Sequence, residues 1–308
     1  MEVKNFFDIP KEEQTKFINS FDQIMFDIDG VILAYLSPIL GAPECVRNLQ
    51  KLGKAVHYVT NNSIMSTKDI AKSLMESNFD TTTHDIVNPI EVNIAYLTKQ
   101  SMKNNIYLIS NNPHKDALEM AGFNILPEKL QIIEENTNAL FEHFDSNLTV
   151  GAVIYDFDFN TNYVQLQKAL WYLQNNSDCI FLVTLNDKVG PTGPRGCLLG
   201  PNIFIETLKN LSGKDFIQVG KPSEACVNFI KEIYHVTDPK RVLFVGDSIE
   251  SDMSTGALGG FQKMLVLTGS TKMEDITNWQ FPEEYKPEYF VESLEVLNKI
   301  IKSIFPNL

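Results

Sequence analysis

Short apolar runs alternate with amphipathic stretches along this chain, a pattern typical of a parallel α/β sheet. The stretch after the first run places Pro43 near the start of a predicted helix and Gly53 at its end. Strands of one core sheet are predicted at Gln23–Ile28, Ala55–Val59, Phe216–Val219, Val242–Val245 and Lys263–Leu267. This alternation predicts an α/β fold with a Rossmann-like, doubly wound parallel sheet.

The same alternation continues through the middle of the chain. Strands are predicted there at Ile106–Ile109, Ala152–Tyr155 and Ile180–Val183, with helical patterns between them. The block is long enough to fold as a domain of its own. We therefore predict a core formed by residues 1–87 and 214–308, with an inserted α/β domain at residues 88–213.

Polar residues follow directly after four of the predicted core strands. These segments are Asp27–Val31, Thr60–Ser63, Gly220–Pro222 and Gly246–Asp252. In an open parallel sheet, such positions meet in the crevice at the carboxyl ends of the strands. Each segment alone could be an ordinary turn, so the prediction rests on their coincidence. Together they predict a phosphoryl-transfer site.

The first segment contains the residues suited to the reaction itself. Asp27, at the end of a strand, is the candidate nucleophile toward phosphorus. Asp29 is the candidate general acid and base, since it could protonate the leaving alcohol and later activate water. Gly30 lacks a side chain, so its backbone can approach the phosphoryl oxygens of the substrate closely.

The other three segments contain residues suited to binding charge. Asp247 and Asp252 would add oxygen ligands for a hard cation, which beside a phosphate suggests Mg²⁺. Lys221 would add a positive charge next to the phosphoryl group. Thr60 and the backbone amides near Asn61 and Asn62 are the expected holders of the phosphoryl oxygens.

Composition argues against several other classes of function. The 308 residues have a formal charge of −13, which argues against a nucleic-acid partner because such binding needs a basic surface. No apolar run approaches the ~20 residues of a membrane span, so we expect no membrane partner. The four scattered cysteines fit no zinc spacing, which favours reduced thiols and a cytoplasmic protein.

The order of the four polar segments resembles the signature of phosphatases of the haloacid dehalogenase superfamily. The stretches Gly41–Glu44 and Val59–Ser63 resemble its branch of 4-nitrophenylphosphatases, phosphoglycolate phosphatases and pyridoxal phosphate phosphatases. Only 32 residues separate Asp27 from Thr60, whereas 160 separate Thr60 from Lys221. An inserted cap domain must therefore lie in the second interval, as in the C2-capped members of the superfamily.

The resemblance implies a role for each residue of the site. It makes Asp27 the nucleophile and Asp29 the general acid and base, with Thr60 and Lys221 as phosphate holders. It also implies a set of Mg²⁺ ligands: Asp27, the carbonyl of Asp29, and Asp247, with Asp252 as a ligand or a support. The implied enzyme is a phosphoric monoester hydrolase that forms an aspartyl-phosphate on small substrates such as 4-nitrophenyl phosphate, phosphoglycolate or pyridoxal phosphate.

The inserted domain differs more from the branch. Its stretch Thr184–Asp187 and the glycine-rich loop around Arg195 stand where the branch has its substrate contacts. Asn186 and Arg195 are therefore candidate substrate-binding residues, although such residues also serve as ordinary loop contacts. Members of the branch often form homodimers through the cap, so we expect a homodimer.

Two alternatives stay open from the sequence. The same site could serve a phosphotransferase or a phosphomutase, although the position of the cap and the intact Asp29 favour hydrolysis. The chain could also be a non-catalytic binding or scaffold protein that uses the cap surface. The intact Asp27 and Lys221 argue against that second alternative.

Overall fold

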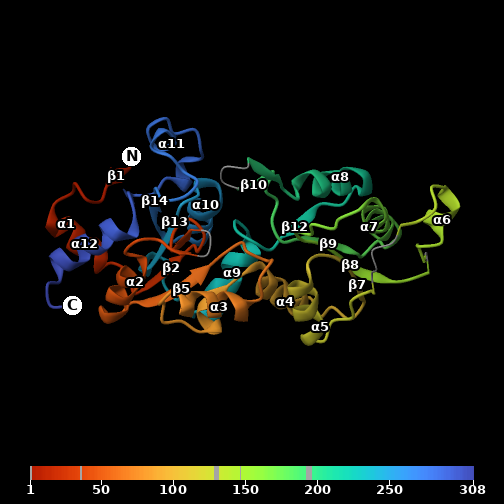
Figure 1. Cartoon of the computed structure of the whole chain (residues 1–308), viewed down its shortest axis with the longest axis horizontal. Helices are drawn as coiled ribbons and strands as arrows, with labels where there is room; N and C mark the ends of the chain where they lie inside the picture. Colours follow the sequence, from red (N-terminus) through yellow and green to blue (C-terminus); the bar gives the residue numbers. More distant parts are fainter. Residues whose placement is uncertain (1, 35–36, 128–131, 146, 192–195) are drawn as a thin grey trace. The chain divides into compact units, whose positions relative to one another are not determined.

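The computed structural model describes residues 2–34, 37–127, 132–145, 147–191 and 196–308. The chain divides into two compact units (Figure 1). The first unit contains Met1–Thr60, Thr67–Asn88 and Lys221–Leu308, and the second contains Asn61–Ser66 and Pro89–Gly220. Among the described residues, no helix has both the length and the apolar character needed to cross a membrane.

The first unit is built on a seven-stranded sheet in which all neighbouring strands are parallel. In sheet order the strands are β1 (Lys4–Asn5), β15 (Tyr289–Val291), β14 (Gln262–Val266), β13 (Val242–Gly246), β2 (Gln23–Phe26), β5 (Ala55–Val59) and β6 (Ile86–Val87). The central strands are almost wholly apolar and buried, as expected for a parallel sheet covered on both faces. The predicted α/β class with a doubly wound parallel sheet is confirmed.

Helices of the first unit alternate with these strands along the chain. They are α1 (Lys11–Ile18), α2 (Ala42–Lys51), α3 (Thr67–Glu76), α9 (Glu224–Ile233), α10 (Ser254–Gly259), α11 (Met273–Thr277) and α12 (Leu294–Ile304). Pro43 lies in the first turn of α2, as its sequence position predicts. A short hairpin, β3 (Leu33–Ala34) and β4 (Ser37–Pro38), follows β2.

The second unit has its own parallel sheet of four strands. In sheet order these are β12 (Phe216–Gln218), β9 (Ile180–Val183), β8 (Val150–Tyr155) and β7 (Asn105–Ile109). Its helices are α4 (Pro89–Lys99), α5 (Asn112–Met120), α6 (Thr137–Phe141), α7 (Tyr163–Asn175) and α8 (Asn202–Ser212). An antiparallel hairpin, β10 (Val189–Pro191) and β11 (Cys197–Leu199), lies between β9 and α8. The unit is thus an α/β domain with its own core.

One strand belongs to a different sheet from the one predicted. The run at Phe216 was assigned to the core sheet, but β12 pairs in parallel with β9, with Phe216 opposite Phe181. A strand that follows a helix pairs most readily with the strand before that helix, here through the β9–α8–β12 crossover. The second unit consequently extends to Gly220, beyond the predicted boundary at residue 213.

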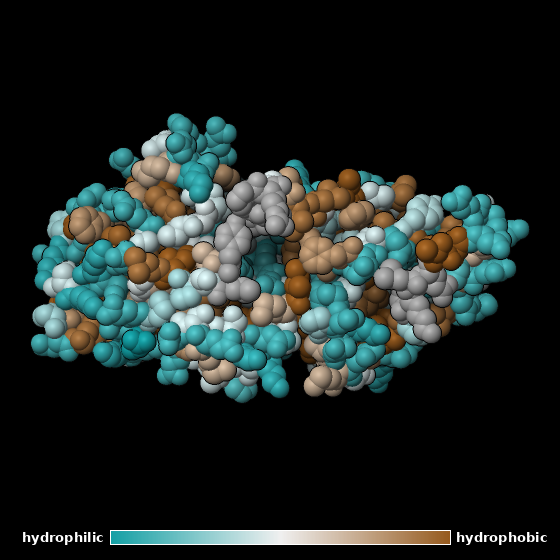
Figure 2. All heavy atoms as spheres, in the orientation of Figure 1, coloured by the Kyte–Doolittle hydropathy of each residue, from teal (hydrophilic) through white to brown (hydrophobic). Residues whose placement is uncertain are grey.

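Apolar side chains also reach the surface of the second unit. Exposed ones gather on the β10–β11 hairpin and the start of α8, at Val189, Leu198, Leu199 and Ile203. Figure 2 shows brown side chains over this region, whereas much of the remaining visible surface is hydrophilic. A group of exposed apolar residues of this kind is a candidate contact surface.

Candidate active site

Three neighbouring strands of the first unit end beside one another. In the order β13, β2 and β5, they lead directly into Asp247, Asp27 and Thr60. The backbone amide of Asp27 still bonds to β13, donating to the Val245 carbonyl at 2.9 Å. The polar residues after these strands therefore meet at one edge of the sheet, where parallel α/β folds bind their ligands.

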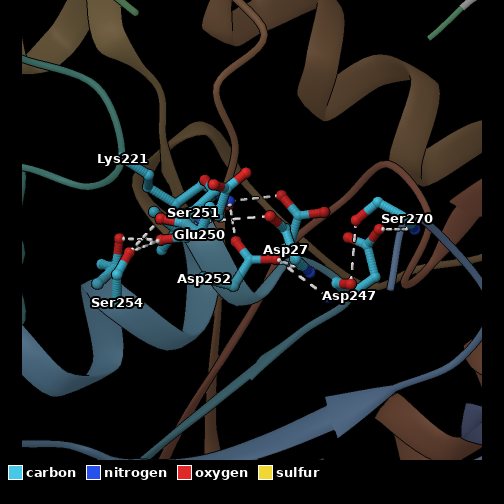
Figure 3. A network of polar contacts seen from close by, with 11 residues as sticks. Asp27, Lys221, Asp247, Glu250, Ser251, Asp252, Ser254 and Ser270 are labelled. Carbon is cyan, nitrogen blue, oxygen red and sulfur yellow. Dashed lines mark hydrogen bonds and ion pairs between the residues drawn. The ribbon is translucent and has the colours of Figure 1, made fainter. Parts of the chain in front are cut away.

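Lys221 joins two of the carboxylates. Its ammonium nitrogen lies 2.5 Å from Asp27 Oδ1 and 2.7 Å from Asp252 Oδ1, and it donates to the Val59 carbonyl at 2.8 Å (Figure 3). The residue is only 3% exposed. Although burial lowers the pKa of Lys221, Asp252 and Asp27 raise it overall, so the amine is charged. A buried cation in this position holds both carboxylates in place.

Three buried carboxylates could bind a metal ion. One oxygen each from Asp27, Asp247 and Asp252 lies within 4.8 Å of the others. Oxygen donors with this much negative charge suit a hard cation such as Mg²⁺. Burial, followed by the nearby carboxylates, raises the pKa of Asp27 and of Asp247. The site therefore has an excess of buried negative charge that one lysine only partly balances, and a divalent cation fits it.

Asp252 has little free capacity as a ligand. Its Oδ1 accepts from Lys221, and its Oδ2 accepts from the backbone amides of Asp247 at 3.0 Å and Ser248 at 3.1 Å. A π-helical turn, Ile249–Met253, presents the side chain to these donors. These contacts indicate that Asp252 stabilises both the turn after β13 and the position of Lys221. Of the two roles that the sequence left open for Asp252, cation ligand or support, they favour the support role.

Asp29 and Gly30 lie in the turn after β2. Asp29 has solvent-accessible surface, yet the protein around it removes part of the water from its carboxyl group. This partial desolvation raises the pKa of Asp29, and Lys221 opposes the shift. Gly30 has a φ of +92°, and a Cβ at this position would lie 2.9 Å from Asp247 Cγ. Only glycine satisfies both the left-handed backbone and this close approach.

The candidate substrate-binding residues fall into two groups. Thr60 is buried next to the carboxylates' strand ends, whereas Asn61 and Asn62 group with the second unit. Asn62 Oδ1 accepts from the amides of Ile64 and Met65, so it stabilises a local turn. Two further candidates lie in the second unit.

Asn186 accepts a hydrogen bond from the Asn202 side chain at 2.9 Å, and Arg195 lies outside the described residues. This hydrogen bond is an ordinary loop contact, which was the alternative interpretation of Asn186. A substrate role for these residues stays a prediction.

The sequence-based prediction overlooked the segment Thr268–Thr271. Ser270 donates its backbone amide to Asp247 Oδ2 at 2.6 Å, and the Thr268 hydroxyl donates to the Gly30 carbonyl. Its composition, polar and directly after a predicted strand, is the same signal that identified the other segments. The site therefore includes a fifth strand-end segment.

Comparison with known proteins agrees with this geometry. A family model described as haloacid dehalogenase-like hydrolase matches residues 24–124, and a second, HAD-hydrolase-like, model matches residues 218–297. The chain belongs to the haloacid dehalogenase superfamily. The matched residues of this haloacid dehalogenase-like hydrolase include Asp27, Lys221 and Asp247. The predicted resemblance to the superfamily is therefore confirmed.

Several relatives of this haloacid dehalogenase-like hydrolase are similar over nearly their full length. Phosphoglycolate phosphatase 2 of Arabidopsis thaliana is 28% identical, over 92% of this chain and 95% of the relative. The 4-nitrophenylphosphatase of Schizosaccharomyces pombe is 29% identical, over 94% and 96%. Glycerol-3-phosphate phosphatase of Homo sapiens is 25% identical, over 92% of each chain.

Solved structures show the same fold. The p-nitrophenyl phosphatase from Archaeoglobus fulgidus superposes with a TM-score of 0.77 at 24% identity, covering 91% of this chain and 99% of that one. The 4-nitrophenylphosphatase from Thermotoga maritima has a TM-score of 0.75 at 23% identity, covering 92% and 98%. The fold of this haloacid dehalogenase-like hydrolase, inserted cap domain included, is that of these phosphatases.

Proposed function

We propose that this haloacid dehalogenase-like hydrolase is a Mg²⁺-dependent phosphatase that hydrolyses small phosphate monoesters through a phosphorylated Asp27. The phosphatase class follows from the family and from relatives that are named as phosphatases. The observation that supports the mechanism most directly is the buried contact of Lys221 with Asp27, beside Asp247. Nucleophile, positive charge and cation ligands are thus assembled at one strand edge.

Asp27 and Asp247 would hold the Mg²⁺, together with the carbonyl of Asp29. The ion, when bound, would neutralise charge on the phosphoryl group and on the buried carboxylates. Lys221 contributes a fixed positive charge at Asp27 that is already oriented in the protein. Such preorganised charges favour the ionised form of Asp27, which is the form that can attack phosphorus.

Each chemical step has a residue suited to it. A carboxylate oxygen of Asp27 forms a bond to phosphorus while the bond from phosphorus to the ester oxygen breaks. Asp29 gives its proton to that leaving oxygen, and burial raises its pKa toward the range in which a carboxyl can act as an acid. Asp29 then takes a proton from water, which attacks phosphorus and releases inorganic phosphate and the free Asp27 carboxylate.

The substrate class is a small phosphate monoester. The names of the relatives specify phosphoglycolate, 4-nitrophenyl and glycerol-3-phosphate phosphatases. These three esters and pyridoxal phosphate, which the sequence resemblance suggests, form the panel to test. The second unit carries Asn186 and Arg195, the residues we propose for discriminating among them.

Assembly and location are further parts of the proposal. The exposed apolar side chains of the β10–β11 hairpin support a homodimer formed through the cap domain. All four cysteines are free thiols, which supports a reducing, cytoplasmic compartment. A Leu199→Lys variant should run as a monomer in light scattering if the hairpin forms the interface, and an unchanged dimer mass would place the interface elsewhere.

The test of the proposed function is phosphate release from the panel, measured with Mg²⁺ and with EDTA. Wild-type protein should release phosphate only with Mg²⁺, and Asp27→Asn should release none because its amide is not a nucleophile. Asp8→Asn makes the same chemical change at an exposed position and should keep full activity.

Two outcomes would favour the alternatives. Transfer of phosphate to an added alcohol instead of water would indicate a phosphotransferase. A folded wild type that releases no phosphate from any ester, and is not phosphorylated on Asp27, would refute the proposal and favour a scaffold role.

A further inference from the structure

The segment Thr268–Thr271, which we name the β14 loop, contacts Asp247 at several points. It follows β14, which pairs with β13, the strand that leads into Asp247. Its backbone amides donate to this residue twice, from Ser270 to Oδ2 at 2.6 Å and from Thr271 to the carbonyl at 3.0 Å. The Ser270 hydroxyl donates to the same carbonyl at 3.1 Å. Asp247 is thus held through both its carboxylate and its backbone.

Two glycines enclose the carboxylate of Asp247. A Cβ on Gly269, in the β14 loop, would lie 1.9 Å from Asp247 Oδ2, and a Cβ on Gly30 would lie 2.9 Å from Asp247 Cγ. Real Cβ atoms essentially never come within 3.0 Å of such a neighbouring atom, so a side chain at either position would force the carboxylate to shift. The Thr268 hydroxyl bonds to the Gly30 carbonyl and thereby ties the two glycine segments together.

These contacts leave one oxygen of Asp247 available. Oδ2 accepts the Ser270 amide, whereas within the described ranges no hydrogen-bond donor contacts Oδ1. Figure 3 shows Ser270 on one side of Asp247, with Asp27 and Asp252 on the other. A carboxylate with one oxygen fixed in this way presents the other in a defined direction, which is how supporting hydrogen bonds orient metal ligands.

We propose that the β14 loop positions Asp247 for the divalent cation, with Gly269 and Ser270 as positioning residues. This inference rests on the proposed function, since it assumes that Asp247 is a cation ligand. The loop works through two physical effects, the amide bond that fixes Oδ2 and the absence of side-chain atoms that would displace the carboxylate. Loss of such support typically lowers metal affinity by about ten- to hundredfold.

The direct test is Mg²⁺ binding to the full chain without substrate, measured by isothermal titration calorimetry. Gly269→Ala should weaken binding by about ten- to hundredfold, because its methyl group displaces the Asp247 carboxylate. Gly53→Ala is the matched control, since a Cβ there has nothing within 4 Å. It introduces strain at a positive φ far from the ligand, so it should bind Mg²⁺ like the wild type.

A gentler variant keeps the test valid if Gly269→Ala does not fold. Ser270→Ala removes the hydroxyl that donates to the Asp247 carbonyl and keeps the backbone amide, so it should weaken Mg²⁺ binding by about two- to tenfold. Ser270→Thr keeps a hydroxyl and should restore affinity. In phosphate release, both weakened variants should need more Mg²⁺ for half-maximal rate yet regain much of the rate at saturating Mg²⁺.

The outcomes separate this inference from the proposed function. If the wild type binds Mg²⁺ and hydrolyses esters but Gly269→Ala and Ser270→Ala bind it equally well, the positioning role is wrong and the phosphatase assignment stands. If the wild type binds no divalent cation, the Mg²⁺ proposal and this inference are both overturned.

Discussion

Lys221 offers the sharpest test of how the site is held together. Lys221→Met removes the positive charge and keeps an unbranched side chain of similar length. In the wild type the ammonium contacts Asp27 at 2.5 Å and Asp252 at 2.7 Å, and both carboxylates are buried. Removing one partner of a buried ion pair typically costs about 3–5 kcal/mol, because the remaining charge is left uncompensated. That is a large part of the roughly 5–15 kcal/mol that stabilises a domain.

The stability that Lys221→Met loses should depend on pH in a defined direction. Burial raises the pKa of Asp27, and Lys221 opposes this shift. Without the lysine the folded-state pKa of this carboxyl lies still further above its unfolded value. The folded variant then takes up a proton as the pH falls, so it should be more stable at pH 5 than at pH 8 in EDTA. Mg²⁺ at pH 8 should recover part of the loss for the same electrostatic reason.

Urea unfolding followed by tryptophan fluorescence can measure the stability of the first unit, which contains the site. The chain has two tryptophans, Trp279 in the first unit and Trp171 in the second. A Trp171→Phe background therefore reports on the unit that contains the site. Asp27→Asn in combination with Lys221→Met should restore stability relative to Lys221→Met alone, because it removes the uncompensated charge. Equal stability of wild type and Lys221→Met at pH 8 in EDTA would refute this account of the site.

Three further predictions concern other parts of the molecule. Gly30→Ala should lower kcat/KM by about a hundredfold, since its Cβ would displace Asp247, and near-normal turnover would contradict that. His57 has a pKa of about 4 because of burial, so its protonation favours the unfolded chain, and stability should fall by about 2 kcal/mol between pH 7.5 and pH 5. His57→Phe should not show this pH-dependent fall in its free energy of unfolding, measured with urea. The same pH dependence of stability in the variant and the wild type would contradict the prediction. Asp156→Asn should destabilise the second unit by about 1–3 kcal/mol, because the buried carboxylate is hydrogen-bonded to His114, Ser63 and Thr184 and an amide accepts through only one of its two terminal atoms. An unchanged urea midpoint in Trp171 fluorescence would contradict this.

Much of the site could be predicted because its residues sit at strand ends. Asp27, Thr60 and Asp247 each follow an apolar run directly, and the geometry of a parallel sheet brings such ends together. The β14 loop has the same placement, yet Thr268 and Ser270 are residue types common in any turn. Its importance depends on the Ser270 backbone amide, which leaves no mark in residue type, and on the space beside Asp247 that Gly269 leaves open, although a glycine is also common in any turn.

Lys221 shows the limit of local reasoning about strands. The residue was predicted to follow a core strand, but β12 lies in the sheet of the second unit, and Lys221 belongs to the first. An apolar run of three or four residues has a strand propensity but no partner preference, since hydrogen bonds between strands are the same in every parallel sheet. The assignment of β12 therefore needed the tertiary structure.

The sequence by itself determined the α/β class, the central strands of the core sheet and the identity of the candidate catalytic groups. Those properties follow from hydrophobic periodicity and from side-chain chemistry, which are local. Only the tertiary structure decided that both oxygens of Asp252 accept hydrogen bonds, while one oxygen of Asp247 accepts none from the part of the chain that the structure describes. Lys221, which donates to Asp252, and Ser270, which donates to Asp247, lie 31 and 23 residues away from these acceptors in the chain, so they meet them only when the sheet has formed.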